Sequence, residues 1–309
     1  MHNQPKTWLF AALCLASLLP QVGTATALAG GILFSLLFGN PWMLLTSLWS
    51  KRLLQLSVVG LGFGLGIDQV WRVGKESIAW TVISILLTLL AGWLLGRALK
   101  TPPRTSILIS FGTAICGGSA IAAMAPVIDA KDDEIAVSLA TVFTLNAVAL
   151  LVFPPVGHLL KLSQHDFGIW AGLAIHDTSS VVGAAAVYGS SALAIATTVK
   201  LSRAIWIAPF VTGTAWFNKS KKRVGIPLFI IGFIAASSMR TLLPELAPVW
   251  NGASSVAKQA LVLTLFLIGS GLSRSVLQKI GLRPLVQGFV LWLLVSVGTL
   301  AAVRWELFG

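Results

Sequence analysis

Apolar residues form long runs along the 309-residue chain, and short polar stretches separate them. Most of the runs are about 20 residues or longer, close to the length that a helix needs to cross the hydrocarbon core of a bilayer, and the first, 8–20, is shorter. No period-two alternation is present, so the runs predict helices rather than strands. We expect about eleven membrane spans, with ten as the alternative, at 8–20, 22–39, 53–68, 77–98, 105–128, 133–158, 166–188, 191–217, 225–241, 255–273 and 283–305.

Composition supports an all-α membrane protein. Hydrophobic residues make up 56% of the chain and charged residues only 10%, whereas a soluble domain carries about 25% charged residues. With the N-terminus in the cytoplasm, fourteen of the 22 Lys and Arg residues fall on the inner side, six on the outer side and two within a span, as the positive-inside rule requires. Eleven spans then place the C-terminus outside. No basic stripe is interleaved with aromatic residues, so the net charge of +12 does not indicate nucleic-acid binding.

The spans predict a single polytopic membrane domain, 1–309, with internal symmetry. The run 8–20 resembles a signal peptide, with Ala25-Thr26-Ala27 as a cleavage-like site, but we expect it to be retained as an extra first helix. The other spans form two sets of five, 22–158 and 166–305. An odd number of helices in each set makes the second set inverted relative to the first, as in many secondary transporters.

Three spans contain residues that weaken a helix. They are Gly112–Ala120, His176–Ser180 and Ile268–Ser273. Glycine pairs permit an unwound segment, and such backbone persists at membrane depth only where protein buries it or water lines it. We therefore expect broken helices. Close helix packing through small residues is the alternative, and for Gly269-Ser270-Gly271 it has equal weight.

Charged residues near the middle of two spans indicate a functional site, because a charge at that depth is costly unless it is paired or hydrated. His176 and Asp177 lie in one span. Lys200 and Arg203 lie in another, three residues apart and hence on one helical face. With His176 neutral, the formal sum is +1, which favours an anionic ligand. A guanidinium suits an oxyanion, and an ammonium supplies a point charge.

We accordingly predict two groups of site residues and no metal or cofactor. The substrate-binding residues are Lys200, Arg203, Cys116, Gly117, Gly118, Ser119, Ser179 and Ser270. The coupling or gating residues are His176, Asp177, Thr178 and Asn146. An ATP-binding GxxxxGK[ST] motif is absent, so transport would be driven by a gradient or by another subunit.

Functions other than transport of an anion find less support in the sequence. Cys116, His176 and Asp177 could form a nucleophile, base and orienting group, but adjacent His and Asp side chains usually point in different directions, and neither HExxH nor GxSxG occurs. We therefore do not expect an enzyme. A cation/proton antiporter that uses Asp177 stays open, as does a channel or a ligand-sensing membrane receptor.

Two motifs carry a resemblance to a known family. The segments Phe111–Ala123 and Ile175–Ala184, together with Lys200-Leu201-Ser202-Arg203 and Gly269-Ser270-Gly271-Leu272, resemble the YeiH-type sulfate exporter family of bacterial inner-membrane proteins. The resemblance covers nearly the whole chain. It implies a sodium/proton-antiporter-like fold with crossed broken helices, an inner-membrane location, and sulfate, a sulfonate or a similar oxyanion as substrate. H⁺ or Na⁺ coupling and a homodimer are left open.

Overall fold

The computed structural model describes residues 4–217, 228–271 and 281–305, and within these ranges it contains helices and no strands. Five helices are long and apolar enough to cross a membrane: Ala79–Ala98, Asp133–Leu159, Ser190–Phe217, Pro244–Ser270 and Leu282–Arg304. A sixth results if Met43–Gly62 and Ile67–Lys75, which are bent by 105°, count as one span. The multi-pass helical membrane protein expected from the sequence is therefore confirmed, whereas eleven spans and the inverted repeats stay predictions.

The chain divides into two compact units, and each unit draws on both predicted repeats. Unit 1 comprises Met1–Val70 and Pro227–Arg274, and unit 2 comprises Trp71–Ile226 and Ser275–Gly309. Each unit is described by itself.

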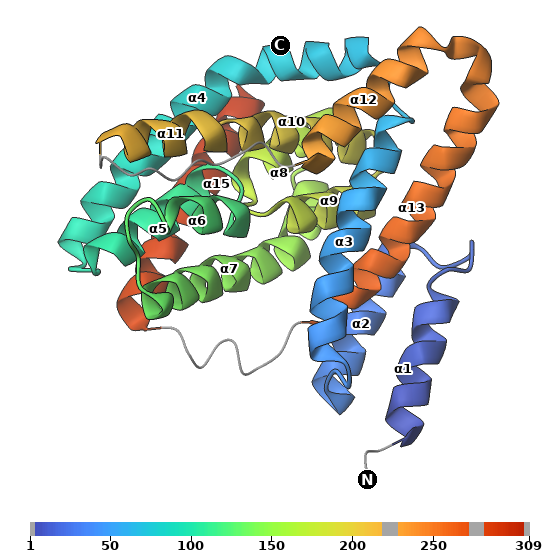
Figure 1. Cartoon of the computed structure of the whole chain (residues 1–309), viewed down its shortest axis with the longest axis horizontal. Coiled ribbons are helices and arrows are strands. Elements are labelled where there is room, and N and C mark those ends of the chain that lie inside the picture. The colour runs from blue at the N-terminus through green and yellow to red at the C-terminus, as the bar shows by residue number, and fades with distance from the viewer. Residues whose placement is uncertain (1–3, 218–227, 272–280, 306–309) are drawn as a thin grey trace. The chain divides into compact units, whose positions relative to one another are not determined.

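Unit 1 is built around α13 (Figure 1). Its described helices are α1 (Gln4–Ala16), α2 (Thr24–Phe38), α3 (Met43–Gly62), α12 (Leu228–Leu242), the 3-10 helix Pro244–Leu246 and α13 (Ala247–Ser270). α13 packs against α2 and α3, and buried Phe10, Phe34 and Phe266 form an aromatic cluster between α1, α2 and α13. Arg240 donates a 2.9 Å hydrogen bond to the carbonyl of Phe63, the residue that follows α3 at its C-terminal end.

The break predicted within 268–273 stays a prediction, because the structure describes this segment only as far as Gly271. α13 continues through Gly269 and ends at Ser270, while Leu272 and Ser273 lie outside the described ranges. A Cβ on Gly269 would lie 3.0 Å from the Ile32 backbone nitrogen in α2. The glycine is therefore explained by close packing of α13 on α2, the alternative reading of this segment.

Unit 2 holds the remaining helices, including both pairs that are interrupted (Figure 1). They are α4 (Ile67–Ala98, whose first residues belong to unit 1), α5 (Pro103–Ala114), α6 (Gly118–Met124), α7 (Asp132–Leu159), α8 (Gln164–Ala174), α9 (Thr178–Tyr188), α10 (Ser190–Ile205), α11 (Ile207–Phe217) and α15 (Leu282–Arg304). α10 packs against α8 and α9, and α7 packs against α5 and α9. The runs predicted at 105–128 and 166–188 are thus each divided into two helices, as expected.

Candidate functional site

The first interruption separates α5 from α6 at Ile115–Gly117. The Ile115 amide still donates to the Phe111 carbonyl at 3.2 Å, and the Gly117 amide reaches back to the Gly112 carbonyl at 2.8 Å. Gly117 adopts φ +67° and ψ −126°, a conformation that a residue with a Cβ adopts only with strain. Glycine at this position therefore allows the chain to leave α5 and start α6 after a short break.

The second interruption separates α8 from α9 at Ile175–Asp177. Asp177 is the N-cap of α9: its Oδ2 accepts the backbone amides of Ser179 at 3.1 Å and Ser180 at 3.3 Å, and also the Ser179 hydroxyl. A carboxylate at this place satisfies amides that have no partner within the helix and interacts favourably with the helix dipole. The sequence His176–Ser180 thus ends one half-helix and caps the next.

The two interruptions meet. A Cβ placed on Gly117 would lie 3.2 Å from the Asp177 Cβ and 3.3 Å from its Cα. Asn146 from α7 supports the meeting point, because its Oδ1 accepts the Asp177 amide at 3.3 Å. The structure therefore brings together the glycine motif of the fifth predicted span and the polar motif of the seventh.

Lys200 and Arg203 of α10 donate hydrogen bonds to carbonyls at the C-terminal ends of α5 and α8, which are the first half-helices of the two interrupted pairs. Lys200 Nζ donates to the Ile115 carbonyl at 3.2 Å. Arg203 Nε donates to the Ala114 carbonyl at 2.6 Å, and its Nη1 donates to the Leu173 carbonyl. These carbonyls belong to the last turns of α5 and α8, where a helix has acceptors without intrahelical partners and a partial negative charge.

Burial makes these contacts energetically significant. Lys200 and Arg203 are both 0% exposed, and hydrogen bonds from charged donors contribute about 1.5–3 kcal/mol each. Arg203 Nη2 also donates to the Ser84 hydroxyl of α4 at 3.2 Å. One arginine thus connects α10 with α4, α5 and α8.

Several buried polar groups on the elements that form the candidate site have no hydrogen-bond partner among the described residues. They are both ring nitrogens of His176, Nδ2 of Asn146 and the hydroxyls of Thr113 and Thr197. His176 directly precedes Asp177, Thr113 lies in the last turn of α5, and Thr197 precedes Lys200 by about one helical turn. Buried polar groups without a partner are rare in native proteins and call for a specific explanation, such as an ordered water or a ligand.

Eleven of the twelve predicted site residues lie in unit 2: within the two interruptions, in the first turns of α6 and α9, or on α7 and α10. They are Cys116, Gly117, Gly118, Ser119, Asn146, His176, Asp177, Thr178, Ser179, Lys200 and Arg203. Ser270 lies in unit 1, where Asn40 Nδ2 donates to its carbonyl at 3.0 Å and contacts its hydroxyl at 3.2 Å. Ser270 is therefore described only as part of unit 1.

Sequence reasoning missed the partners of the two cations. Ser84 lies 119 residues from Arg203 in the chain, and its only signal is a hydroxyl within an apolar run. The carbonyls of Ala114, Ile115 and Leu173 give no signal at all. Within the described residues no group of three or more His, Cys, Asp or Glu side chains could hold a metal ion.

Comparison with known proteins establishes the family. A family description, Conserved hypothetical protein 698, matches residues 9–288. The chain belongs to this family. A UPF0324 membrane protein of Geobacter sulfurreducens is 60% identical over 293 residues, which cover 95% of this chain and 94% of that protein. A UPF0324 membrane protein of Bdellovibrio bacteriovorus is 49% identical over 301 residues, covering 95% and 93%.

This member of the Conserved hypothetical protein 698 family also resembles a UPF0324 membrane protein of Bacteroides thetaiotaomicron, with 50% identity over 283 residues, or 90% and 85% of the two chains. The relatives' names describe membrane proteins and state no substrate. No solved structure matches the chain. The comparisons thus support a multi-pass membrane protein.

Proposed function

We propose that this protein is a secondary active transporter of a small anion, such as sulfate, a sulfonate or a similar oxyanion, and that it works by alternating access. The observation that carries the proposal is the meeting of the two interrupted helices at Gly117 and Asp177, with Lys200 and Arg203 bound to the adjoining helix ends. Half-helix ends near mid-membrane are a common way for transporters to build a binding site.

The charge at the meeting point favours an anion. Lys200 and Arg203 contribute two positive charges and Asp177 one negative charge, so the group carries +1 when His176 is neutral. The ends of the half-helices carry partial charges of both signs and largely cancel. An uncompensated positive charge in a low-dielectric interior is costly, and a bound anion removes that cost. Lys200 is the direct ligand in this proposal, because only one of its three donors is used by a described residue.

The unpartnered groups supply the remaining contacts. Asn146 Nδ2 and the hydroxyls of Thr113 and Thr197 can each donate a hydrogen bond to an oxyanion, and so can a neutral imidazole of His176. Cys116, Gly117, Gly118, Ser119 and Ser179 complete the proposed binding segment around the interruptions. His176, Asp177, Thr178 and Asn146 are assigned to coupling and gating.

We retain eleven membrane passes and two inverted repeats as part of this proposal. The pairs α5/α6 and α8/α9 would each cross the membrane once as a broken span. In the second pair, 22 helical residues extend about 33 Å, enough for a hydrocarbon core of about 30 Å. α1, α2, α3 and α12 would supply the other passes, with the N-terminus in the cytoplasm of a bacterial cell. Labelling of single cysteines introduced at 100, 131 and 161 tests the orientation.

A binding measurement tests the proposed substrate class. Purified protein is heated with sulfate, methanesulfonate, chloride, Na⁺ and Li⁺ in separate titrations, and the transition temperature is recorded. We expect an oxyanion to stabilise the wild type. Lys200→Gln should lose this shift because it keeps a donor for the Ile115 carbonyl but removes the charge. Lys258→Gln, at an exposed lysine of α13, is the matched control and should keep the shift.

A cation/proton antiporter is the second candidate, and one observation favours it. Asp177 is partly exposed, and the hydrogen bonds that it accepts from described residues all go to Oδ2. Its Oδ1 is therefore available to a proton or a cation. Stabilisation by Na⁺ or Li⁺ with no response to any anion would support this candidate and contradict the first. Downhill flux of the anion without counter-transport would instead indicate a channel.

A further inference from the structure

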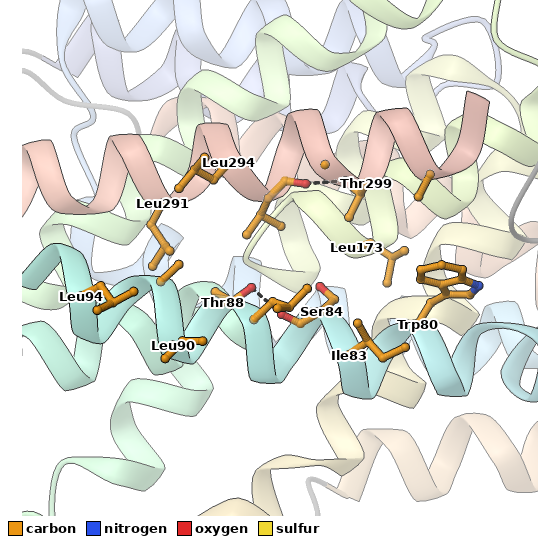
Figure 2. Close-up of a pocket in the computed structure, with 15 residues that line it drawn as sticks. Trp80, Ile83, Ser84, Thr88, Leu90, Leu94, Leu173, Leu291, Leu294 and Thr299 are labelled. Carbon is orange, nitrogen blue, oxygen red and sulfur yellow. Dashed lines mark hydrogen bonds between the residues drawn. The ribbon is translucent and has the colours of Figure 1, made fainter. Parts of the chain in front are cut away.

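An apolar groove of about 410 Å³ lies in unit 2 between α4 and α15 (Figure 2). Leu173 of α8 lies between the two helices, and Leu291 of α15 lies across from Leu94 of α4 (Figure 2). The lining residues are Trp80, Ile83, Ser84, Leu87, Thr88, Leu90, Ala91, Leu94, Leu173, Leu291, Leu294, Val295, Gly298, Thr299 and Ala302.

The hydroxyl groups in the groove wall already make hydrogen bonds within the protein. Thr88 Oγ1 donates to the Ser84 carbonyl at 2.6 Å, and Thr299 Oγ1 donates to the Val295 carbonyl at 2.6 Å. The Ser84 hydroxyl accepts from Arg203 at 3.2 Å. A polar ligand would therefore lose its hydrogen bonds to water on entering, whereas a hydrocarbon chain would lose none.

We expect the groove to open toward the bilayer. Both walls belong to helices that are long and apolar enough to span it. Of the five such helices, the α4 segment Ala79–Ala98 is the least buried, with 28% of its apolar window buried. Exposed Leu90, Leu94 and Leu294 lie on the rims. From Trp80 to Leu94 the groove follows α4 for about 21 Å, and the hydrocarbon depth of one leaflet is about 15 Å. This length accommodates an extended acyl chain.

We propose that this groove binds one acyl chain of a membrane phospholipid. Exposed Arg72 and Lys75 lie in the turns of α4 that precede Trp80, Lys75 about 8 Å away along the helix. They place positive charge where the anionic head group of such a lipid would lie. The acyl chain would fill the space that protein atoms leave open beside α4, the least buried of the five long apolar helices.

The groove has a structural connection to the candidate site. Ser84 and Leu173 line it, and both accept hydrogen bonds from Arg203. An acyl chain in the groove would press on the same two residues that hold the guanidinium in place. The lipid is thus expected to stabilise the Arg203 contacts, whatever the transported substrate is.

Gly298 offers a direct test. It lines the groove, and a Cβ at this position meets no atom within 4 Å, so Gly298→Phe can fill the groove without a backbone clash. Gly213→Phe in α11 is the matched control, because a Cβ at Gly213 also meets nothing within 4 Å and Gly213 does not line the groove. Gly298→Leu is a smaller replacement for use if the phenylalanine variant does not fold.

The assay uses the full-length protein in vesicles that contain phosphatidylglycerol with a photoactivatable diazirine in one acyl chain. After irradiation, we expect labelled peptides from α4 and α15 in the wild type and in Gly213→Phe, and loss of that labelling in Gly298→Phe. In addition, the lipid should raise the transition temperature of delipidated wild type but not of Gly298→Phe. Equal labelling of all three proteins contradicts the proposal. Loss of a dimer in Gly298→Phe, without specific labelling of α4 and α15 in the wild type, would assign the groove to a second copy and also overturn it.

Discussion

Replacing Gly117 by alanine tests the meeting of the two interrupted helices most directly. The substitution adds one methyl group, which must occupy φ +67° and ψ −126°. Holding a non-glycine residue in such a sparsely populated region costs about 1–3 kcal/mol. The new Cβ would also lie 3.2 Å from the Asp177 Cβ, and overpacking of this kind costs about 1–3 kcal/mol. The sum predicts a loss of about 2–6 kcal/mol in the free energy of unfolding.

Gly213→Ala provides the matched control. Gly213 is inside α11, and its Cβ would meet open space. Replacing glycine by alanine within a helix favours the helix by about 0.5–1 kcal/mol. The same chemical change should therefore be stabilising at 213 and strongly destabilising at 117.

Equilibrium unfolding in mixed micelles with increasing SDS measures both variants, with tryptophan fluorescence as the signal. Substrate flux in vesicles provides a second readout, since a displaced Asp177 should reduce transport even where the protein remains folded. If Gly117→Ala matched the wild type within about 0.5 kcal/mol, a level typical of neutral surface substitutions, the proposed contact between the interruptions would be refuted.

Three further predictions concern single residues. Asp177→Asn should change the free energy of unfolding by less than about 1 kcal/mol, because asparagine is an equally good N-cap, yet it should abolish pH-dependent flux; unchanged flux would make Asp177 structural. Ser163→Ala removes the hydroxyl that accepts the Asp166 amide at 3.0 Å and should cost about 0.5–2 kcal/mol without altering flux, which SDS unfolding and a flux assay check together. Arg203→Lys should lower stability more than anion affinity, and Lys200→Gln should do the opposite; thermal shifts with and without the anion separate the two effects.

The broken helices were predictable from sequence because their signals are local. Gly117 and Gly118 stand where α6 begins, just after the break that follows α5, and Asp177 is an N-cap residue type at the start of α9. Apolar runs likewise predicted most helices. They did not predict that α3 begins at Met43 and α4 at Ile67, because a helix continues through polar residues wherever its backbone hydrogen bonds continue.

The contacts of the cations were not predictable, since they join residues far apart in the chain. Lys200 lies 85 residues from Ile115, and Arg203 lies 89 residues from Ala114. The acceptors are backbone carbonyls, which every residue possesses, so no side-chain pattern marks them. Only the burial of two charges in an apolar run signalled that such partners must exist.

Arg203 and Lys200 have different parts in the proposed site because their donors are used differently. Three of the five N–H groups of Arg203 donate to protein oxygens, so the guanidinium is anchored to α4 and to the ends of α5 and α8. Lys200 donates to one carbonyl among the described residues and can turn its other protons toward a ligand. Arg203 would therefore supply positive charge while holding three helices together, and Lys200 would contact the anion. An ammonium that both caps a helix and binds a substrate also links substrate release to the position of that helix, as alternating access requires.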